Sequence, residues 1–156
     1  MDYIYTFLLS ITPVIELRGA IPIAYLHFDL GIIPATFIGI LGGLCIVVFC
    51  LTMLPLLFTF MDQIPVLKKP KDALLEKTRT RHSEKMRLWG EVFLVIMVSI
   101  PLPGSGAFTG STLAYLFGIP ARHAFWLIST GTIISAILVA GLTVSGKGLW
   151  GFLASL

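Results

Sequence analysis

The chain has 156 residues, of which 56% are hydrophobic and only 12% are charged, with a net charge of +3 at pH 7. Because an average soluble domain has about 25% charged residues, this composition excludes a water-soluble globular domain and predicts an integral membrane protein. The length allows one small membrane domain. A buried transport pathway would therefore need a second copy of the chain, and we expect a homodimer.

Four hydrophobic stretches follow one another along the chain, at residues 3–26, 34–61, 92–117 and 121–145. The second and fourth are long enough to cross a hydrocarbon core of about 30 Å as helices. The first and third have Pro/Gly-rich centres, and their leading segments, residues 3–11 and 92–100, would be helices of about 13 Å that reach only the midplane. We predict that each of these two stretches is a re-entrant hairpin. The alternative is four plain spanning helices.

The two halves of the chain resemble each other. Each half contains the same three landmarks in the same order: a Ser-Ile pair, a Gly-Ala pair and an Ala-Tyr-Leu triplet, beginning at Ser10 in the first half and at Ser99 in the second. In each half a Gly-Ile motif with a proline then begins the long span. Because one spanning helix separates the two hairpins, the second hairpin would enter the membrane from the opposite face to the first. We predict an all-α integral membrane fold of two inverted repeats, each a re-entrant helical hairpin followed by a transmembrane helix. Residues 1–61 form the first repeat, 62–91 a connector and 92–156 the second.

The connector is strongly basic. It contains eight of the eleven Lys and Arg residues of the chain. Because apolar spans flank it, the positive-inside rule explains this charge better than nucleic acid binding does, and it places the connector in the cytoplasm and both termini outside. The amphipathic segment 72–89 is typical of a surface helix lying on anionic lipid headgroups.

Glu16 and Arg18 are two charged residues in the middle of the first hydrophobic stretch. A charge at the centre of a membrane helix costs roughly 2.5 to 3.5 kcal/mol, so such residues are usually functional. Pro13 and Pro22 bracket the pair, and we expect a non-helical turn there, in which both side chains face one cavity together with Gly19. Arg18 would bind an anionic group, and Glu16 would exchange a proton or pair with a cation. The alternative is a structural pair that fixes the hairpin tip.

The centre of the third stretch is rich in residues that interrupt helices. A helix that restarts there presents unpaired N–H groups and a partial positive charge, which favour a phosphate or carboxylate. The alternative is a tight turn whose polar atoms satisfy one another. The ligand-facing residues that we expect in this second tip are Pro101, Pro103, Gly104, Ser105, Gly106, Thr109 and Gly110.

Residues 16–22 (Glu-Leu-Arg-Gly-Ala-Ile-Pro) and 101–110 (Pro-Leu-Pro-Gly-Ser-Gly-Ala-Phe-Thr-Gly) together resemble the small multi-drug export family of prokaryotes. That family is similar in layout to the DedA superfamily, which has paired re-entrant hairpins. Some DedA members are implicated in flipping polyprenyl-phosphate lipids with proton coupling. The resemblance implies an acidic residue in the first hairpin, which Glu16 matches, and an arginine in the second. The second tip has no arginine, and the nearest other candidate is Arg122.

These observations predict a small membrane transporter or lipid flippase with a mid-membrane site between two hairpin tips, moving an anionic, phosphate-bearing lipid or a small amphiphile with proton coupling. The alternatives are export of lipophilic cationic drugs and a non-transporting membrane assembly protein. Ser105 has no suitably spaced base, so we expect no enzyme activity, cofactor or metal. We expect a multi-pass protein of the prokaryotic inner membrane, with membrane lipids and no nucleic acid as partners.

Overall fold

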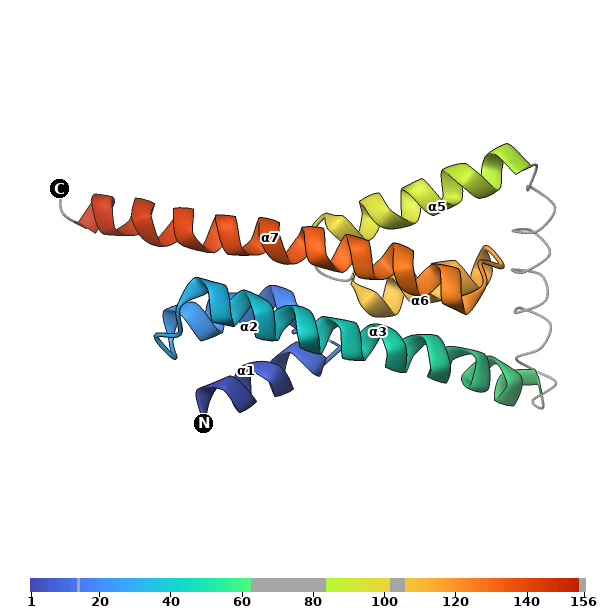
Figure 1. Cartoon of the computed structure of the whole chain (residues 1–156), viewed down its shortest axis with the longest axis horizontal. Helices are drawn as coiled ribbons and strands as arrows, with labels where there is room; N and C mark the ends of the chain where they lie inside the picture. Colours follow the sequence, from blue (N-terminus) through green and yellow to red (C-terminus); the bar gives the residue numbers. More distant parts are fainter. Residues whose placement is uncertain (14, 63–83, 102–105, 155–156) are drawn as a thin grey trace.

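The computed structural model describes residues 1–13, 15–62, 84–101 and 106–154, and these form six helices without a strand. Two short helices precede a long one in each half of the chain (Figure 1). The first half consists of α1 (Asp2–Ile11), α2 (Glu16–Leu26) and α3 (Ile32–Asp62). The second half consists of α5 (Glu84–Ser99), α6 (Ala107–Leu116) and α7 (Ala121–Ala154). The prediction of an all-helical protein is confirmed.

The two long helices run the length of the molecule side by side and pack against each other (Figure 1). Within them, the segments Ile32–Leu56 and Ala121–Gly146 are long and apolar enough to cross a membrane. Large apolar side chains are exposed along both, for example Phe37 and Phe49 on α3 and Trp126 and Ile137 on α7. Exposed apolar surface on this scale is favourable in lipid and not in water. The structure therefore agrees with a membrane protein.

The short helices form two hairpins that approach each other from opposite ends of the molecule (Figure 1). In the first, α1 and α2 pack together and their connection lies near the middle of the long axis. In the second, α5 and α6 enter from the other end and also turn near the middle. At 1.5 Å per residue, the 10 residues of α1 and of α6 give helices of about 15 Å each. The two tips therefore meet between α3 and α7.

Glycines on α3 allow the first hairpin to pack closely. A Cβ atom on Gly42 would overlap the Ser10 hydroxyl of α1, and one on Gly39 would come within 2.8 Å of the Ile21 side chain on α2. On α7, a Cβ atom on Gly131 would come within 2.8 Å of the Val98 side chain on α5. Small residues let membrane helices approach in this way. Each hairpin is thus held against its own long helix by glycine.

Two sequence expectations about helix boundaries need correction. The first helix does end before Pro13, but the expected non-helical turn around Glu16 and Arg18 is wrong, because both belong to the first turn of α2. Pro22 lies inside α2 rather than ending it. Proline is tolerated inside membrane helices because neighbouring groups satisfy the carbonyl that loses its donor. The expected surface helix at 72–89 falls mostly on residues 63–83, outside the described part of the chain, and from Glu84 the chain belongs to α5.

Candidate functional site at the meeting of the hairpin tips

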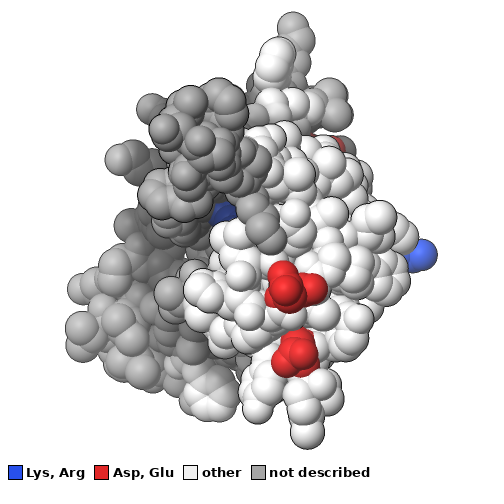
Figure 2. All heavy atoms as spheres, turned by 90° about the vertical axis from the view of Figure 1, so that its left-hand side faces the viewer, with Lys and Arg blue, Asp and Glu red and all other residues white. Residues whose placement is uncertain are grey.

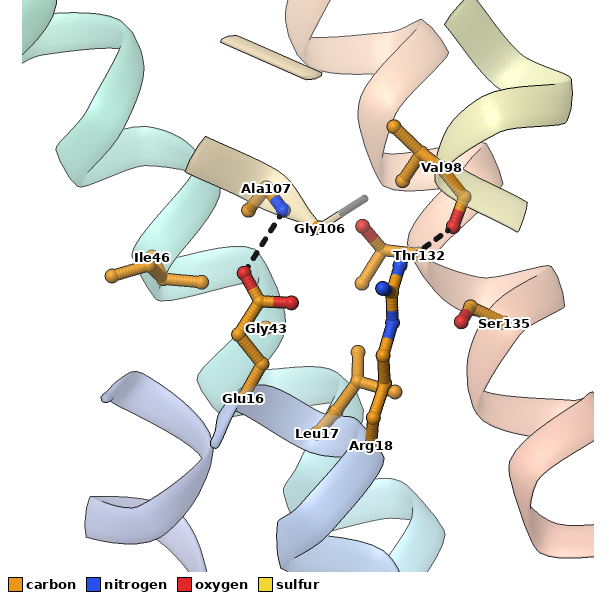
Figure 3. Close-up of a pocket in the computed structure, with 10 residues that line it drawn as sticks. All are labelled: Glu16, Leu17, Arg18, Gly43, Ile46, Val98, Gly106, Ala107, Thr132 and Ser135. Carbon is orange, nitrogen blue, oxygen red and sulfur yellow. Dashed lines mark hydrogen bonds between the residues drawn. The ribbon is translucent and has the colours of Figure 1, made fainter. Parts of the chain in front are cut away.

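Glu16 begins α2 in an unusual backbone conformation. Its φ is +50°, in the left-handed region that residues other than glycine seldom adopt, and its amide donates to the Thr12 carbonyl oxygen across the turn at 2.9 Å. Residues are held in this region mainly at functional or tightly constrained sites. The conformation explains how Glu16 and Arg18, only two residues apart, both point toward the second hairpin (Figure 3).

The Glu16 carboxylate caps the first helix turn of the opposite hairpin. The backbone N–H of Ala107 donates to Glu16 Oε1 at 3.1 Å, and only 8% of Glu16 is exposed. Gly106, the N-cap residue of α6, provides no side-chain cap of its own. Glu16 therefore occupies the anion-binding position at the N-terminus of α6, where a negative charge is favoured. A Cβ atom on Gly106 would overlap the carboxylate, so only glycine leaves room for this contact.

Arg18 makes the complementary contact with the other half of the second hairpin. Its Nη2 donates to the Val98 carbonyl oxygen at 3.2 Å. Because α5 ends at Ser99, this carbonyl is one of the last four of the helix, which lack partners within it. A cation at a helix C-terminus is also favoured by the helix dipole. Glu16 and Arg18 together hold both helix ends of the broken second hairpin (Figure 3).

A small cavity of about 10 Å³ lies between these contacts (Figure 3). Its polar wall combines the side chains of Glu16 and Arg18 with the hydroxyl-bearing residues Thr132 and Ser135 of α7. This volume is about that of one water molecule and much too small for a drug or a lipid headgroup. The centre of the molecule is therefore closed in this conformation. The remaining lining residues are Leu17, Gly43, Ile46, Val98, Gly106 and Ala107.

Two larger pockets flank the closed centre. On the Glu16 side, an apolar groove of about 460 Å³ runs along the second half of α3, and Ile46 lines both this groove and the central cavity. On the Arg18 side, a pocket of about 290 Å³ lies against the later part of α7. Small-molecule sites typically have volumes of about 300–1,000 Å³. Because the second half of α3 and the later part of α7 extend toward opposite ends of the molecule, the two pockets lie on opposite sides of the hairpin tips (Figure 1).

The structure brings together some of the predicted site residues and separates others. Glu16, Arg18 and Gly106 line the central cavity. Pro22 and Pro101, one from each hairpin, line the pocket beside Arg18. The other described candidates do not line the cavity. Gly19 packs on Ile15, and Gly110 packs on Val98 and Ile128. Thr109 lies in the first turn of α6, and Arg122 is exposed at the start of α7. Pro103, Gly104 and Ser105 fall outside the described residues.

Sequence reasoning missed the contribution of α7 to the site. Thr132 and Ser135 are buried there and line the cavity, yet from the sequence we placed the site on the two hairpin tips and, on α7, only at Arg122. A signal for them exists. Ser129, Thr132 and Ser135 recur every three residues along a helix that is otherwise apolar, which predicts one polar face. Among the described residues, no cluster of His, Cys, Asp and Glu could hold a metal ion.

Comparison with known proteins identifies the family. A family model described as "Putative small multi-drug export protein" matches residues 16–138, from the first residue of α2 to the middle of α7. The match therefore includes the central cavity and every residue that lines it. Comparisons with curated proteins and with solved structures found no match. Because the family model covers more than half of the chain, the protein belongs to the small multi-drug export family.

Proposed function

We propose that the protein exports lipophilic cations from the membrane through a centre that Glu16 closes. Its family gives it a transport role, and the substrate class is inferred from the site. The observation that carries the inference is the position of Glu16. Its carboxylate is buried and already occupies the helix N-terminus that an anionic substrate would need. Ile46, which lines the cavity with Glu16, also lines an apolar groove of drug size.

In this proposal the two hairpins are re-entrant and form inverted repeats in the bilayer. The short length of α1 and α6, the approach of the hairpins from opposite ends and the apolar surfaces of α3 and α7 support this placement. The hairpin tips would then meet near the midplane, and a charged pair there is tolerated because it faces protein rather than lipid. Such a junction of broken helices is where transporters bind their substrates.

The charge distribution supports one orientation in the membrane. The basic connector follows α3, so the end of the molecule where α3 finishes would face the cytoplasm. At the opposite end, Asp2 and Asp29 are exposed, and Figure 2 shows acidic side chains on a face whose other described residues are mostly uncharged. The apolar groove beside Glu16 would therefore open toward the inner leaflet, and the pocket beside Arg18 toward the outer one. We place the protein in the inner membrane of a prokaryotic cell.

Transport would follow from competition for one carboxylate. In the closed state Glu16 accepts from the N–H of Ala107. A lipophilic cation that enters the groove with its charge toward Glu16 would compete for that carboxylate, and so would a proton. Loss of the cap would release α6 from the first hairpin and open the centre.

One observation favours a second candidate, the flipping of an anionic lipid. Arg18 lines the pocket of about 290 Å³ together with Pro22 and Pro101. A phosphate in this pocket would meet a guanidinium group, which binds phosphate well. The pocket does not include the N-terminus of α6, which Glu16 covers, so only one of the two expected anion-binding features is open to such a ligand.

The experiment is a transport assay in vesicles that contain the purified full chain. Tetraphenylphosphonium serves as the lipophilic cation, and a fluorescent phosphatidate serves as the anionic lipid. We expect saturable cation movement that Glu16→Gln abolishes and that the matched control Glu91→Gln, outside the cavity, leaves intact. Phosphatidate flipping that is lost in Arg18→Gln but not in Arg122→Gln, without cation movement, would overturn the proposal in favour of the second candidate.

A further inference from the structure

Ser135 has a buried hydroxyl that the fold leaves unsatisfied. Only 1% of the residue is exposed, and its Oγ has no hydrogen-bond partner among the described residues. Ser135 lines the central cavity, and its hydroxyl points toward Arg18 (Figure 3). Buried polar groups in proteins are nearly always hydrogen-bonded, either to protein or to ordered water. A polar molecule in the cavity would satisfy this hydroxyl.

The size of the cavity limits the occupant to a single small molecule. Its volume of about 10 Å³ is close to the minimum that holds one water molecule. A buried water also needs two to four polar partners. The wall offers the Ser135 hydroxyl, the charged groups of Glu16 and Arg18, and Thr132 Oγ1, which donates to the Ile128 carbonyl oxygen at 2.8 Å and so can still accept.

Charge decides between water and an ion of similar size. Glu16 and Arg18 contribute one negative and one positive group to the same wall. A small cation would be attracted by Glu16 but repelled by Arg18, and the reverse holds for a small anion, so neither gains a net attraction that offsets the cost of leaving bulk water. A neutral molecule that both donates and accepts hydrogen bonds does not pay this cost. Water is the common molecule of this size and chemistry.

We propose that the cavity is a binding site for one ordered water molecule, which joins Ser135 of α7 to the Glu16–Arg18 pair. The water would connect α7 to the junction of the two hairpins, in addition to the hydrogen bonds that the pair makes with α5 and α6. It would be bound while the centre is closed and released when the tips separate. This inference does not rest on the identity of the transported substrate.

The test is X-ray hydroxyl-radical footprinting of the full chain in nanodiscs, in which a bound water oxidises the side chains beside it. Leu17 lines the cavity and neither of the larger pockets, whereas Leu94 is also buried but lies elsewhere in the core. We expect oxidation of Leu17 well above that of Leu94, with slow exchange of the oxygen label from ¹⁸O water. Oxidation of Leu17 no greater than that of Leu94 would overturn the proposal.

Serine variants provide the matched comparison. Ser111, Ser129 and Ser135 are all buried in helices without a hydrogen-bond partner in the described part of the chain, but only Ser135 lines the cavity. We expect Ser135→Ala to reduce oxidation of Leu17 to the level of Leu94, and Ser129→Ala and Ser111→Ala to leave it unchanged. Equal oxidation in all three variants would contradict the role of Ser135. If Ser135→Ala does not fold, the ratio of Leu17 oxidation to Leu94 oxidation in the wild-type protein alone decides whether the cavity holds a water.

Discussion

Gly106→Ala is the substitution that most sharply tests the closed centre. The backbone of Gly106, with φ −81° and ψ −159°, is extended and accessible to alanine, so the change introduces no backbone strain. The new Cβ atom would instead overlap the Glu16 carboxylate. The substitution should therefore push Glu16 away from the N–H of Ala107 and leave the rest of the fold in place.

The expected magnitude follows from the contact that is lost. A hydrogen bond to a charged group contributes about 1.5–3 kcal/mol. The favourable position of a negative charge at a helix N-terminus adds about 0.3–1 kcal/mol. Together these predict a loss of about 2–4 kcal/mol in the free energy of unfolding. For a chain of this length the midpoint of thermal unfolding should fall by about 4–16 °C.

The assay is thermal unfolding in nanodiscs, arranged as a double-mutant cycle. Gly141→Ala is the matched control, because a Cβ atom there meets nothing within 4 Å and alanine favours the helix. In a Glu16→Ala background the carboxylate is absent, so Gly106→Ala should cost almost nothing further. The coupling energy between the two sites should then be about 2–4 kcal/mol. Additive effects of the two substitutions, or equal stability of Gly106→Ala and Gly141→Ala, would refute the reasoning.

Two further predictions concern packing and surface charge. Gly42→Ala should destabilise the protein by about 1–3 kcal/mol, because its Cβ overlaps the Ser10 hydroxyl, and Ser10→Gly should restore much of the loss in thermal unfolding. An unchanged midpoint in Gly42→Ala would show that α1 does not pack on α3 as described. Glu91→Gln should change the stability by less than about 1 kcal/mol, because its contact with His123 at 3.4 Å is between partly exposed groups. A loss of several kcal/mol in urea titration would contradict this.

The sequence predicted the helix breaks well, because proline and glycine act locally. The interruptions after Ile11 and after Ser99 needed only the chemistry of the residues that follow. It also predicted that Glu16 and Arg18 share a cavity, but for the wrong reason. The expected turn is the start of a helix, and the side chains converge because of the positive φ of Glu16, which depends on tertiary packing.

The partners of the charged pair could not be predicted from the sequence. The analysis expected a ligand at the N-terminus of α6, whereas the structure places Glu16 there. That contact joins residues 91 positions apart and depends on how the two hairpins meet. The same limit applies to Ser135, whose burial in the cavity wall depends on the rotation of α7 about its axis. Neither the Glu16–Ala107 contact nor the burial of Ser135 in the cavity wall follows from the local sequence pattern.

We propose that Glu16 closes the molecule by binding the first turn of α6, and the amide resonance of Ala107 reports this contact most directly. An N–H that donates to a carboxylate has a strongly downfield proton shift, so NMR of the protein in nanodiscs should show this for Ala107. In Glu16→Ala the Ala107 proton should move upfield, while that of Ala124, buried on α7 away from the cavity, stays in place. An Ala107 resonance that is unaffected by Glu16→Ala would contradict the account.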